Sequence, residues 1–152
     1  MTAHTAHRGL RRRERALNAV VRGLADLGVS LAGARTLTVR GRRTGAEHRV
    51  PVNPLRLGGE QYLVAPRGET DWVRNARAHP QAQLRRGRSV TAVHLAEVTD
   101  PEIKLAVIER YLQRWGWEVA GLLPDGITPG DDAPTLRRHL DALPVFHARP
   151  GT

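Results

Sequence analysis

The sequence predicts an α+β fold, in which a mostly antiparallel sheet curls into a small barrel and helices flank it at both ends of the chain. Segments of alternating apolar and polar residues follow one another through the middle of the chain. Glycine-containing turns separate these segments, and segments of helical periodicity come first and last. At 152 residues, the chain fits one domain with a real core. We expect a disordered N-terminus over residues 1–9 and a single domain over residues 10–152.

The first helical segment begins near Leu10, and arginines crowd its start. Its apolar residues recur every three or four positions, at Leu17, Val20, Val21, Leu24 and Leu27. A basic amphipathic helix either packs its apolar stripe on its own core or lies on a membrane surface. Packing on the core is the commoner outcome, and the sequence leaves membrane association open.

Five strands are expected next, over residues 35–41, 49–57, 60–65, 81–86 and 89–99. Pro51 and Pro54 restrict the second strand to a sheet edge or a bulged course, because proline cannot donate to a ladder. Gly58-Gly59 and Gly87 mark hairpin turns. A short helix over residues 70–78, with Thr70 as its N-cap, separates the third strand from the fourth.

Two helices and a short strand complete the chain. Thr99 or Asp100 caps the first helix, and Pro101 occupies a first-turn position where its missing N–H costs nothing. The buried stripe of this helix is predicted at Ile108, Tyr111, Leu112, Trp115 and Val119. Asp132 is expected to cap a helix that carries Leu136, Leu140 and Leu143. Val145-Phe146 then returns to the sheet as a last short strand.

Composition narrows the function classes. The net charge of +9 suggests an anionic partner, although arginine supplies every basic residue except Lys104, as codon bias alone would produce. The absence of cysteine excludes disulfides and thiolate chemistry, and the seven histidines lack metal-binding spacing, so no metal site is predicted. Without a membrane-spanning run or a secretion signal, a cytoplasmic location is expected. The arginines are not interleaved with exposed aromatic residues, which argues against nucleic acid.

Two loops carry the candidate site. The first places Arg42, Arg43 and Arg49 beside Thr44. The second offers Arg67 and Gly68, followed by a helix start with Thr70, Trp72 and Asn75. Guanidinium groups and helix-start N–H groups both bind anions, so these loops together predict a site for a phosphorylated ligand. The alternative is an ordinary polar hairpin loop with solvated arginines.

No catalytic motif accompanies this site. The first loop lacks the spacing and lysine of a phosphate-binding P-loop, and no helix follows it as in a dinucleotide-binding fingerprint. No G-x-S-x-G elbow is present. If the protein is an enzyme, a bound cofactor is therefore expected to supply the chemistry.

The run L-T-V-R-G-R-R-T-G…P-V-N-P-L, followed by Y-L-V-A-P-R-G-E-T-D-W-V-R-N, resembles the deazaflavin-dependent nitroreductase family. Members of that family are small split β-barrel proteins, FMN-binding-like in fold, that use coenzyme F420. The likeness covers roughly residues 35–98, and the later run Y-L-Q-R-W-G-W-E-V resembles one branch of the family more loosely. The two motifs are specific in combination, and neither would suffice alone.

The resemblance implies a role for each candidate residue. Arg42, Arg43 and Arg49 would hold the phosphate and acidic tail of F420, with His48 as an alternative to Arg49. The other implied cofactor-binding residues are Thr44, Val52, Asn53, Ala65, Pro66, Arg67, Gly68, Trp72 and Asn75. Val52 and Asn53 would lie along the deazaflavin edge, while residues 65–68 would wrap the ring and its ribityl chain. Trp72 and Asn75 would close the pocket.

The resemblance also implies the reaction, a hydride transfer from reduced deazaflavin to an enone, a quinone or a nitro compound. Tyr111 and Trp115 would lie on the substrate side, with the Tyr111 hydroxyl as a candidate proton donor. Some relatives carry several tyrosines in this segment and this chain keeps one, which argues against nitroaromatic acceptors. The alternatives are an FMN-binding split barrel and a non-enzymatic basic module that binds anions. By analogy with split barrels, a homodimer is compatible with this fold.

Overall fold

The computed structural model of the protein describes residues 34–151. The segment predicted to be disordered, residues 1–9, and the helix predicted to begin near Leu10 lie outside the described residues. The domain limits predicted from the sequence therefore stay a prediction. No helix in the described range is long and apolar enough to cross a membrane.

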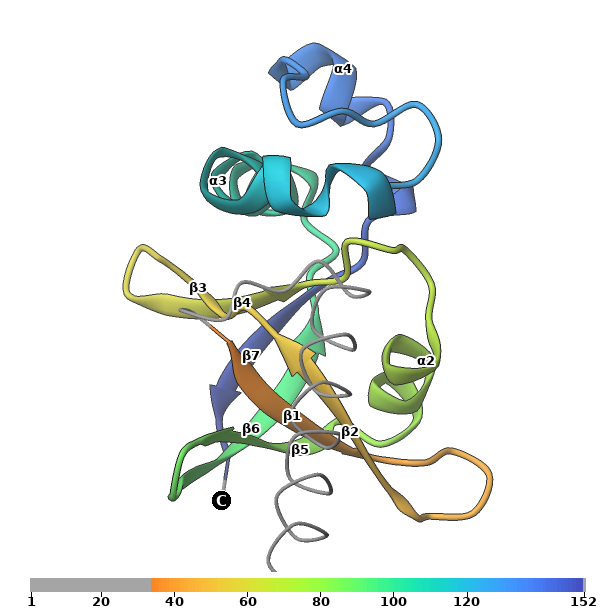
Figure 1. Ribbon diagram of the computed structural model, residues 1–152, viewed down its shortest axis with the longest axis vertical. Coiled ribbons are helices and arrows are strands. Elements are labelled where there is room, and N and C mark those ends of the chain that lie inside the picture. Colours follow the sequence, from red (N-terminus) through yellow and green to blue (C-terminus); the bar gives the residue numbers. More distant parts are fainter. Residues whose placement is uncertain (1–33, 152) are drawn as a thin grey trace, which may run out of the picture.

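Seven strands form one sheet in the order β2-β1-β5-β6-β7-β4-β3 (Figure 1). In chain order they are β1 (Arg35–Arg40), β2 (Glu47–Val52), β3 (Leu55–Leu57), β4 (Glu60–Val64), β5 (Gln81–Arg86), β6 (Ser89–Glu97) and β7 (Val145–Pro150). Every neighbouring pair is antiparallel. The sheet curls into a half-barrel, which confirms the predicted α+β split-barrel fold.

Helices cover the sheet at two places (Figure 1). Helix α2 (Asp71–Ala78) lies against β1 and β6, while α3 (Pro101–Val119) lies across β3, β4 and β7 with α4 (Ala133–Arg137) beyond it. Two short 3-10 turns, Ala120–Leu122 and Leu140–Ala142, follow α3 and α4. The Asp100 carboxylate caps α3, since it accepts hydrogen bonds from the N–H groups of Glu102 and Ile103 at 2.9 and 3.3 Å.

The core consists of two clusters, one on each face of the sheet. Side chains of successive strand residues point to opposite faces, so β4 and β7 contribute to both clusters. Leu63 and Phe146 pack with the α2 side, whereas Tyr62, Val64 and Val145 pack under α3. The predicted stripe of α3 is buried throughout its length. The two clusters fix α2 and α3 relative to the strands between them.

Two predicted elements differ from the structure. The strand predicted over residues 49–57 is two strands, broken at Asn53-Pro54, because Pro54 has no N–H for the ladder. The helix predicted to carry Leu136, Leu140 and Leu143 ends at Arg137. Pro144 disfavours a helical conformation at the residue before it, and that residue is extended. The chain thereby enters β7, which is longer than the predicted two-residue strand and lies inside the sheet.

Candidate functional site

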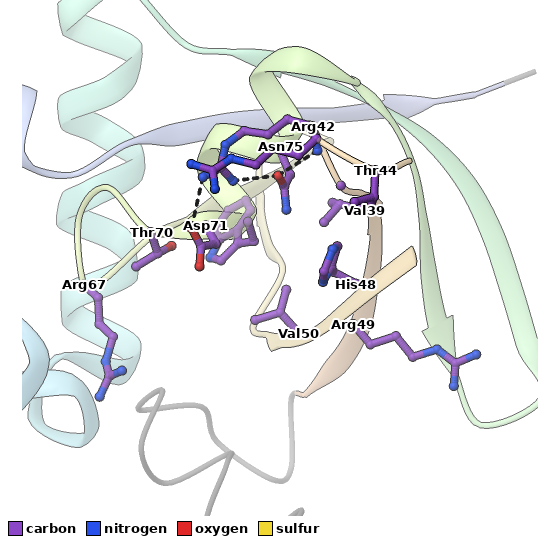
Figure 2. A pocket seen from close by; sticks show the side chains of 13 residues that line it. Val39, Arg42, Thr44, His48, Arg49, Val50, Arg67, Thr70, Asp71 and Asn75 are labelled. Carbon is purple, nitrogen blue, oxygen red and sulfur yellow. Dashed lines mark hydrogen bonds and ion pairs between the residues drawn. The ribbon is translucent and has the colours of Figure 1, made fainter. Parts of the chain in front are cut away.

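A cavity of about 560 Å³ opens between the β1–β2 loop, β2 and the start of α2 (Figure 2). The structure brings the two predicted loops together around it. Seven predicted site residues line it, namely Arg42, Arg43, Thr44, Arg49, Arg67, Trp72 and Asn75. Its remaining walls include Val39, His48, Val50, Thr70 and Asp71. The cavity is therefore rich in basic side chains, and one acidic side chain also faces it.

A second, much smaller cavity of about 20 Å³ adjoins the first. Val50, Arg67, Thr70 and Trp72 line both cavities. The small cavity gathers the predicted ring contacts Val52, Asn53, Ala65 and Pro66, together with Tyr111. The predicted tail-binding and ring-binding residues thus occupy adjoining spaces that share one wall.

Two predicted residues, Gly68 and Trp115, are not among the residues that line these cavities. Gly68 is buried with a φ of +82°, and a Cβ there would lie 3.0 Å from the carbonyl oxygen of Ala142. The backbone at Gly68 comes close to the backbone at Ala142, and glycine permits this approach because it has no side chain. Trp115 packs against Tyr111, with ring centroids 5.2 Å apart, and is buried. Trp115 therefore contacts Tyr111 without lining either cavity.

The β1–β2 loop is a compact turn built on its glycines. The Gly41 N–H donates to the Ala46 carbonyl at 2.7 Å, and the Gly45 N–H donates to the Gly41 carbonyl at 2.9 Å. Gly45 has a φ of +74°, which a residue with a side chain adopts only under strain. The Thr44 hydroxyl accepts from the Ala46 N–H at 3.2 Å. The turn leaves the Arg43 side chain exposed at the cavity rim.

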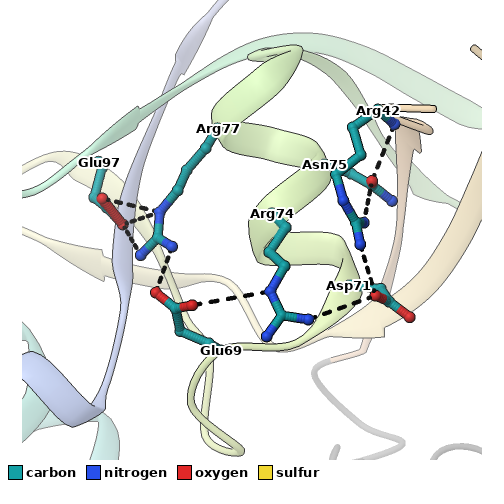
Figure 3. Close-up of polar contacts among 7 residues, drawn as sticks. All are labelled: Arg42, Glu69, Asp71, Arg74, Asn75, Arg77 and Glu97. Atoms are coloured by element: carbon teal, nitrogen blue, oxygen red, sulfur yellow. Dashed lines mark hydrogen bonds and ion pairs between the residues drawn. The ribbon is translucent and has the colours of Figure 1, made fainter.

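Arg42 is tied to α2 (Figure 3). The Asn75 side-chain oxygen accepts hydrogen bonds from the backbone N–H of Arg42 at 3.1 Å and from its Nη1 at 2.8 Å. The Arg42 Nη2 lies 3.3 Å from the Asp71 carboxylate. Because both partners of the Asn75 oxygen are donors, they fix the amide orientation and turn its nitrogen toward the cavity (Figure 2). Arg42 therefore anchors the loop.

His48 and Arg49 lie on opposite faces of β2. His48 pairs with the buried Val39 of β1, whereas Arg49 pairs with Thr38. Figure 2 shows the His48 ring directed between Val39 and Val50, and the Arg49 guanidinium directed away from the cavity centre. Of the two alternatives that the sequence left open, His48 faces the cavity.

A second polar network holds the outer side of α2 (Figure 3). The Arg77 guanidinium donates to both Glu97 oxygens, at 2.8 to 3.1 Å, and to Glu69 at 2.5 Å. These hydrogen bonds, those to Glu97 first, raise the pKa of Arg77 above its usual value, while Arg77 lowers the pKa of Glu69. The network joins α2 to β6 and to the loop after β4, so it holds the cavity wall in place.

Two residues that carry a hydroxyl group, Thr70 and Tyr111, line the small cavity. Burial raises the pKa of Tyr111 well above its ordinary value, so this side chain stays protonated at neutral pH. Thr70 precedes α2 as predicted, but its side chain makes no capping hydrogen bond. Its Oγ1 is buried and has no hydrogen-bond partner within the described part of the chain. Since buried polar atoms normally have a partner, this hydroxyl fits the polar edge of a bound ligand.

Replacing Thr70 by valine tests that reading. The change removes an unpaired buried hydroxyl and keeps the side-chain shape, so the free energy of unfolding should stay constant or rise by about 1 kcal/mol. If the hydroxyl contacts a ligand, the same variant should bind that ligand about five- to tenfold more weakly. Denaturant unfolding and a binding titration measure the two effects. A variant that is less stable but binds normally would contradict a ligand-facing hydroxyl.

A sequence model of the F420H(2)-dependent quinone reductase family matches residues 11–115, which span more than half of the chain. The chain belongs to this family. Within the structure, the match runs from β1 to Trp115 in α3 and includes every residue that lines the two cavities. As a member of the F420H(2)-dependent quinone reductase family, the protein is an oxidoreductase that uses reduced F420, which confirms the resemblance seen in its motifs.

Two solved structures with a TM-score above 0.5 agree on the fold. A Listeria innocua protein provisionally assigned as a pyridoxamine 5'-phosphate oxidase is 16% identical with a TM-score of 0.54, covering 79% of this chain and 85% of that one. The heme storage protein HutZ from Vibrio cholerae is 11% identical with a TM-score of 0.54, and the match covers 88% of this chain and 89% of HutZ. An F420H2-dependent reductase, FDR-A, is 20% identical with a TM-score of 0.48, and the match covers 77% of this chain and 94% of FDR-A. No match was found among curated proteins.

Some features of the site were missed by reasoning from the sequence. Asp71 was not singled out, although it faces the cavity and pairs with Arg42. Thr70 was expected to cap α2 through its side chain, and its hydroxyl is instead unpaired. The direction of His48 could have been found, because strand alternation puts it on the same face as Val50 and Val52.

Proposed function

We propose that the protein binds F420 across both cavities and reduces a small quinone. The acidic tail would occupy the 560 Å³ cavity, and the deazaflavin ring would lie against Trp72 at the entrance to the small cavity. The observation that carries this proposal is the shared wall, since one elongated ligand spanning both spaces would contact Arg67, Thr70 and Trp72. The quinone acceptor follows the name of the family.

The side chains present fit such a ligand. Arg43 and Arg67 are exposed at the cavity and supply guanidinium groups for phosphate and carboxylate oxygens. The Asn75 amide nitrogen and the unpaired Thr70 hydroxyl supply hydrogen bonds for the polar edge of a heterocycle. Arg42 would act mainly by positioning, because Asn75 and Asp71 already hold its guanidinium.

When bound, F420 in its reduced form supplies a hydride, and the acceptor must also gain a proton. The chain contributes orientation, because Trp72 and the residues of the small cavity restrict how a planar group can lie. Val52, Val64 and Ala65 are buried, so this wall would exclude water from the reacting atoms of a bound ligand. The Tyr111 hydroxyl stays protonated, and it would donate a hydrogen bond to an acceptor oxygen bound in the small cavity.

A titration with F420 tests the proposal directly. Trp72 lines both cavities, so a bound deazaflavin should quench tryptophan fluorescence in a saturable manner. Reduced F420 should then be consumed when a soluble quinone is added. Emission that does not change at high micromolar F420 would rule the proposal out, and binding without quinone reduction would rule out the acceptor alone.

Changing Arg43 to alanine separates a ligand contact from general surface charge. A lost charge-assisted hydrogen bond should weaken F420 binding by about 1.5–3 kcal/mol. Arg85 is also exposed but belongs to β5 and does not line either cavity, so Arg85→Ala should do little. Both variants lose one positive charge, and their dissociation constants are compared at the same ionic strength. Equal effects would mean that the loop has no special role.

A further inference from the structure

We propose that a third cavity, around Lys104 at the start of α3, binds a small monocarboxylate whose body is apolar. The cavity has a volume of about 280 Å³ and lies between the end of β6, the first turn of α3 and the segment that leads into β7. None of its lining residues lines either of the other two cavities. The proposal is therefore independent of the proposed function.

Lys104 lacks a contact that would neutralise its charge. It is the only lysine of the chain, and it is partly buried. Its ammonium forms no hydrogen bond or ion pair with the described residues, although the charges of Asp141 and Glu97 act on it from farther away. Burial lowers the pKa of Lys104, because the ammonium loses hydration without gaining a counter-charge in contact. A bound carboxylate would supply the missing partner.

The two carboxylates of the cavity leave this need open. The Arg77 guanidinium donates three hydrogen bonds to Glu97, at 2.8 to 3.1 Å, on the side of α2 away from Arg42 (Figure 3). Asp141 belongs to the 3-10 turn Leu140–Ala142 and is exposed, so water can solvate it. Lys104 is partly withdrawn from water, and it is therefore the group that favours a ligand of opposite charge.

The lining limits the ligand to one negative charge and a small apolar body. The two cations, Arg77 and Lys104, are balanced by the two carboxylates, which would repel a dianion more strongly than a monoanion. Apart from Thr99, the remaining lining residues are apolar, namely Val98, Pro101, Leu140 and Pro144. The volume is slightly below the range of about 300–1,000 Å³ that is typical of ligand pockets, so the cavity fits a molecule such as benzoate and excludes a dinucleotide.

Nuclear magnetic resonance of protein that is isotope-labelled in lysine and in the methyl groups of leucine and valine tests the proposal. The single lysine signal reports on this cavity, and the Val98 and Leu140 methyl signals report on its apolar wall. Benzoate is the probe, and benzamide is the uncharged molecule of the same shape. At constant ionic strength, benzoate should shift these signals in a saturable manner, and benzamide should bind about tenfold more weakly.

Three variants assign the contact. Lys104→Met keeps the length of the side chain and removes its charge, so benzoate should no longer shift the Val98 and Leu140 methyl signals. Asp141→Asn removes a carboxylate that repels the anion and should tighten benzoate binding by about two- to threefold. Arg110→Gln is the control, because Arg110 is exposed on the same helix and lines none of the three cavities. Its affinity for benzoate should equal that of the unaltered protein.

A lysine signal that benzoate does not shift would overturn the proposal. Equal affinities for benzoate and benzamide would do the same, as would a Lys104→Met variant whose methyl signals respond to benzoate like those of the unaltered protein. Weaker binding in Asp141→Asn would show that the anion does not lie beside Lys104. If Arg110→Gln weakens binding as much as Lys104→Met does, general surface charge attracts the anion and the proposal fails. None of these outcomes depends on whether the protein binds F420.

Discussion

Replacing Trp72 by alanine is expected to lower the free energy of unfolding by about 3–5 kcal/mol and to abolish measurable F420 binding. Trp72 is 8% exposed and packs on Phe146, with ring centroids 5.5 Å apart. It belongs to the core cluster beneath α2 and also lines both cavities. Its loss would leave a hole in the core and remove the wall that the two cavities share, so stability and binding should fall together.

Trp117 offers a matched control, because it is 82% exposed on α3 and lines neither cavity. Trp117→Ala should change the free energy of unfolding by no more than about 0.5 kcal/mol. Denaturant unfolding followed by circular dichroism measures stability, and calorimetry measures binding, since Trp72→Ala also removes the fluorescent reporter. Normal F420 affinity in Trp72→Ala at a temperature where it is folded would show that this tryptophan has no part in the site.

The local pattern predicted most of the fold because alternation and turn residues are properties of short segments. Gly58-Gly59 and Gly87 adopt the positive φ that their hairpins need, as the sequence indicated. What the pattern could not give depends on distant partners. The strand Val145–Pro150 lies between β6 and β4 because it forms backbone hydrogen bonds with both. Its own residues do not indicate which strands it pairs with. The break at Pro54 likewise separates two strands that pair with different neighbours.

The same distinction applies to the site. Two loops with arginine, glycine and a helix start predicted an anion-binding place, and the structure brings these loops together around one cavity. The sequence could not state which arginines are available. Arg42 and Arg43 are adjacent, yet the first is held by Asn75 and Asp71 while the second is exposed. That difference arises from contacts across more than 25 residues of chain, so it appears only once α2 is placed against the loop.

Asn75 allows the anchoring of the loop to be separated from the recognition of an anion. Its side-chain oxygen accepts two hydrogen bonds from Arg42, and the residue is 4% exposed. Asn75→Ala leaves both donors without this partner and should lower the free energy of unfolding by about 2–3 kcal/mol. Asn75→Asp keeps an acceptor for both donors and pairs with the Arg42 charge, so it should stay within about 1 kcal/mol of the unaltered protein.

In the Asn75→Asp variant, F420 binding should be weakened although the fold stays stable. The carboxylate replaces an amide nitrogen that faces the cavity, so it would repel an acidic tail and weaken F420 binding by more than about tenfold despite a stable fold. Gln83→Glu supplies the control, because it adds the same charge at an exposed position of β5 that does not line the cavities. Unfolding curves and F420 titrations of the three variants measure both effects. If Asn75→Asp binds F420 as well as Gln83→Glu does, the amide does not face the anionic ligand, and Asn75 acts through the loop alone.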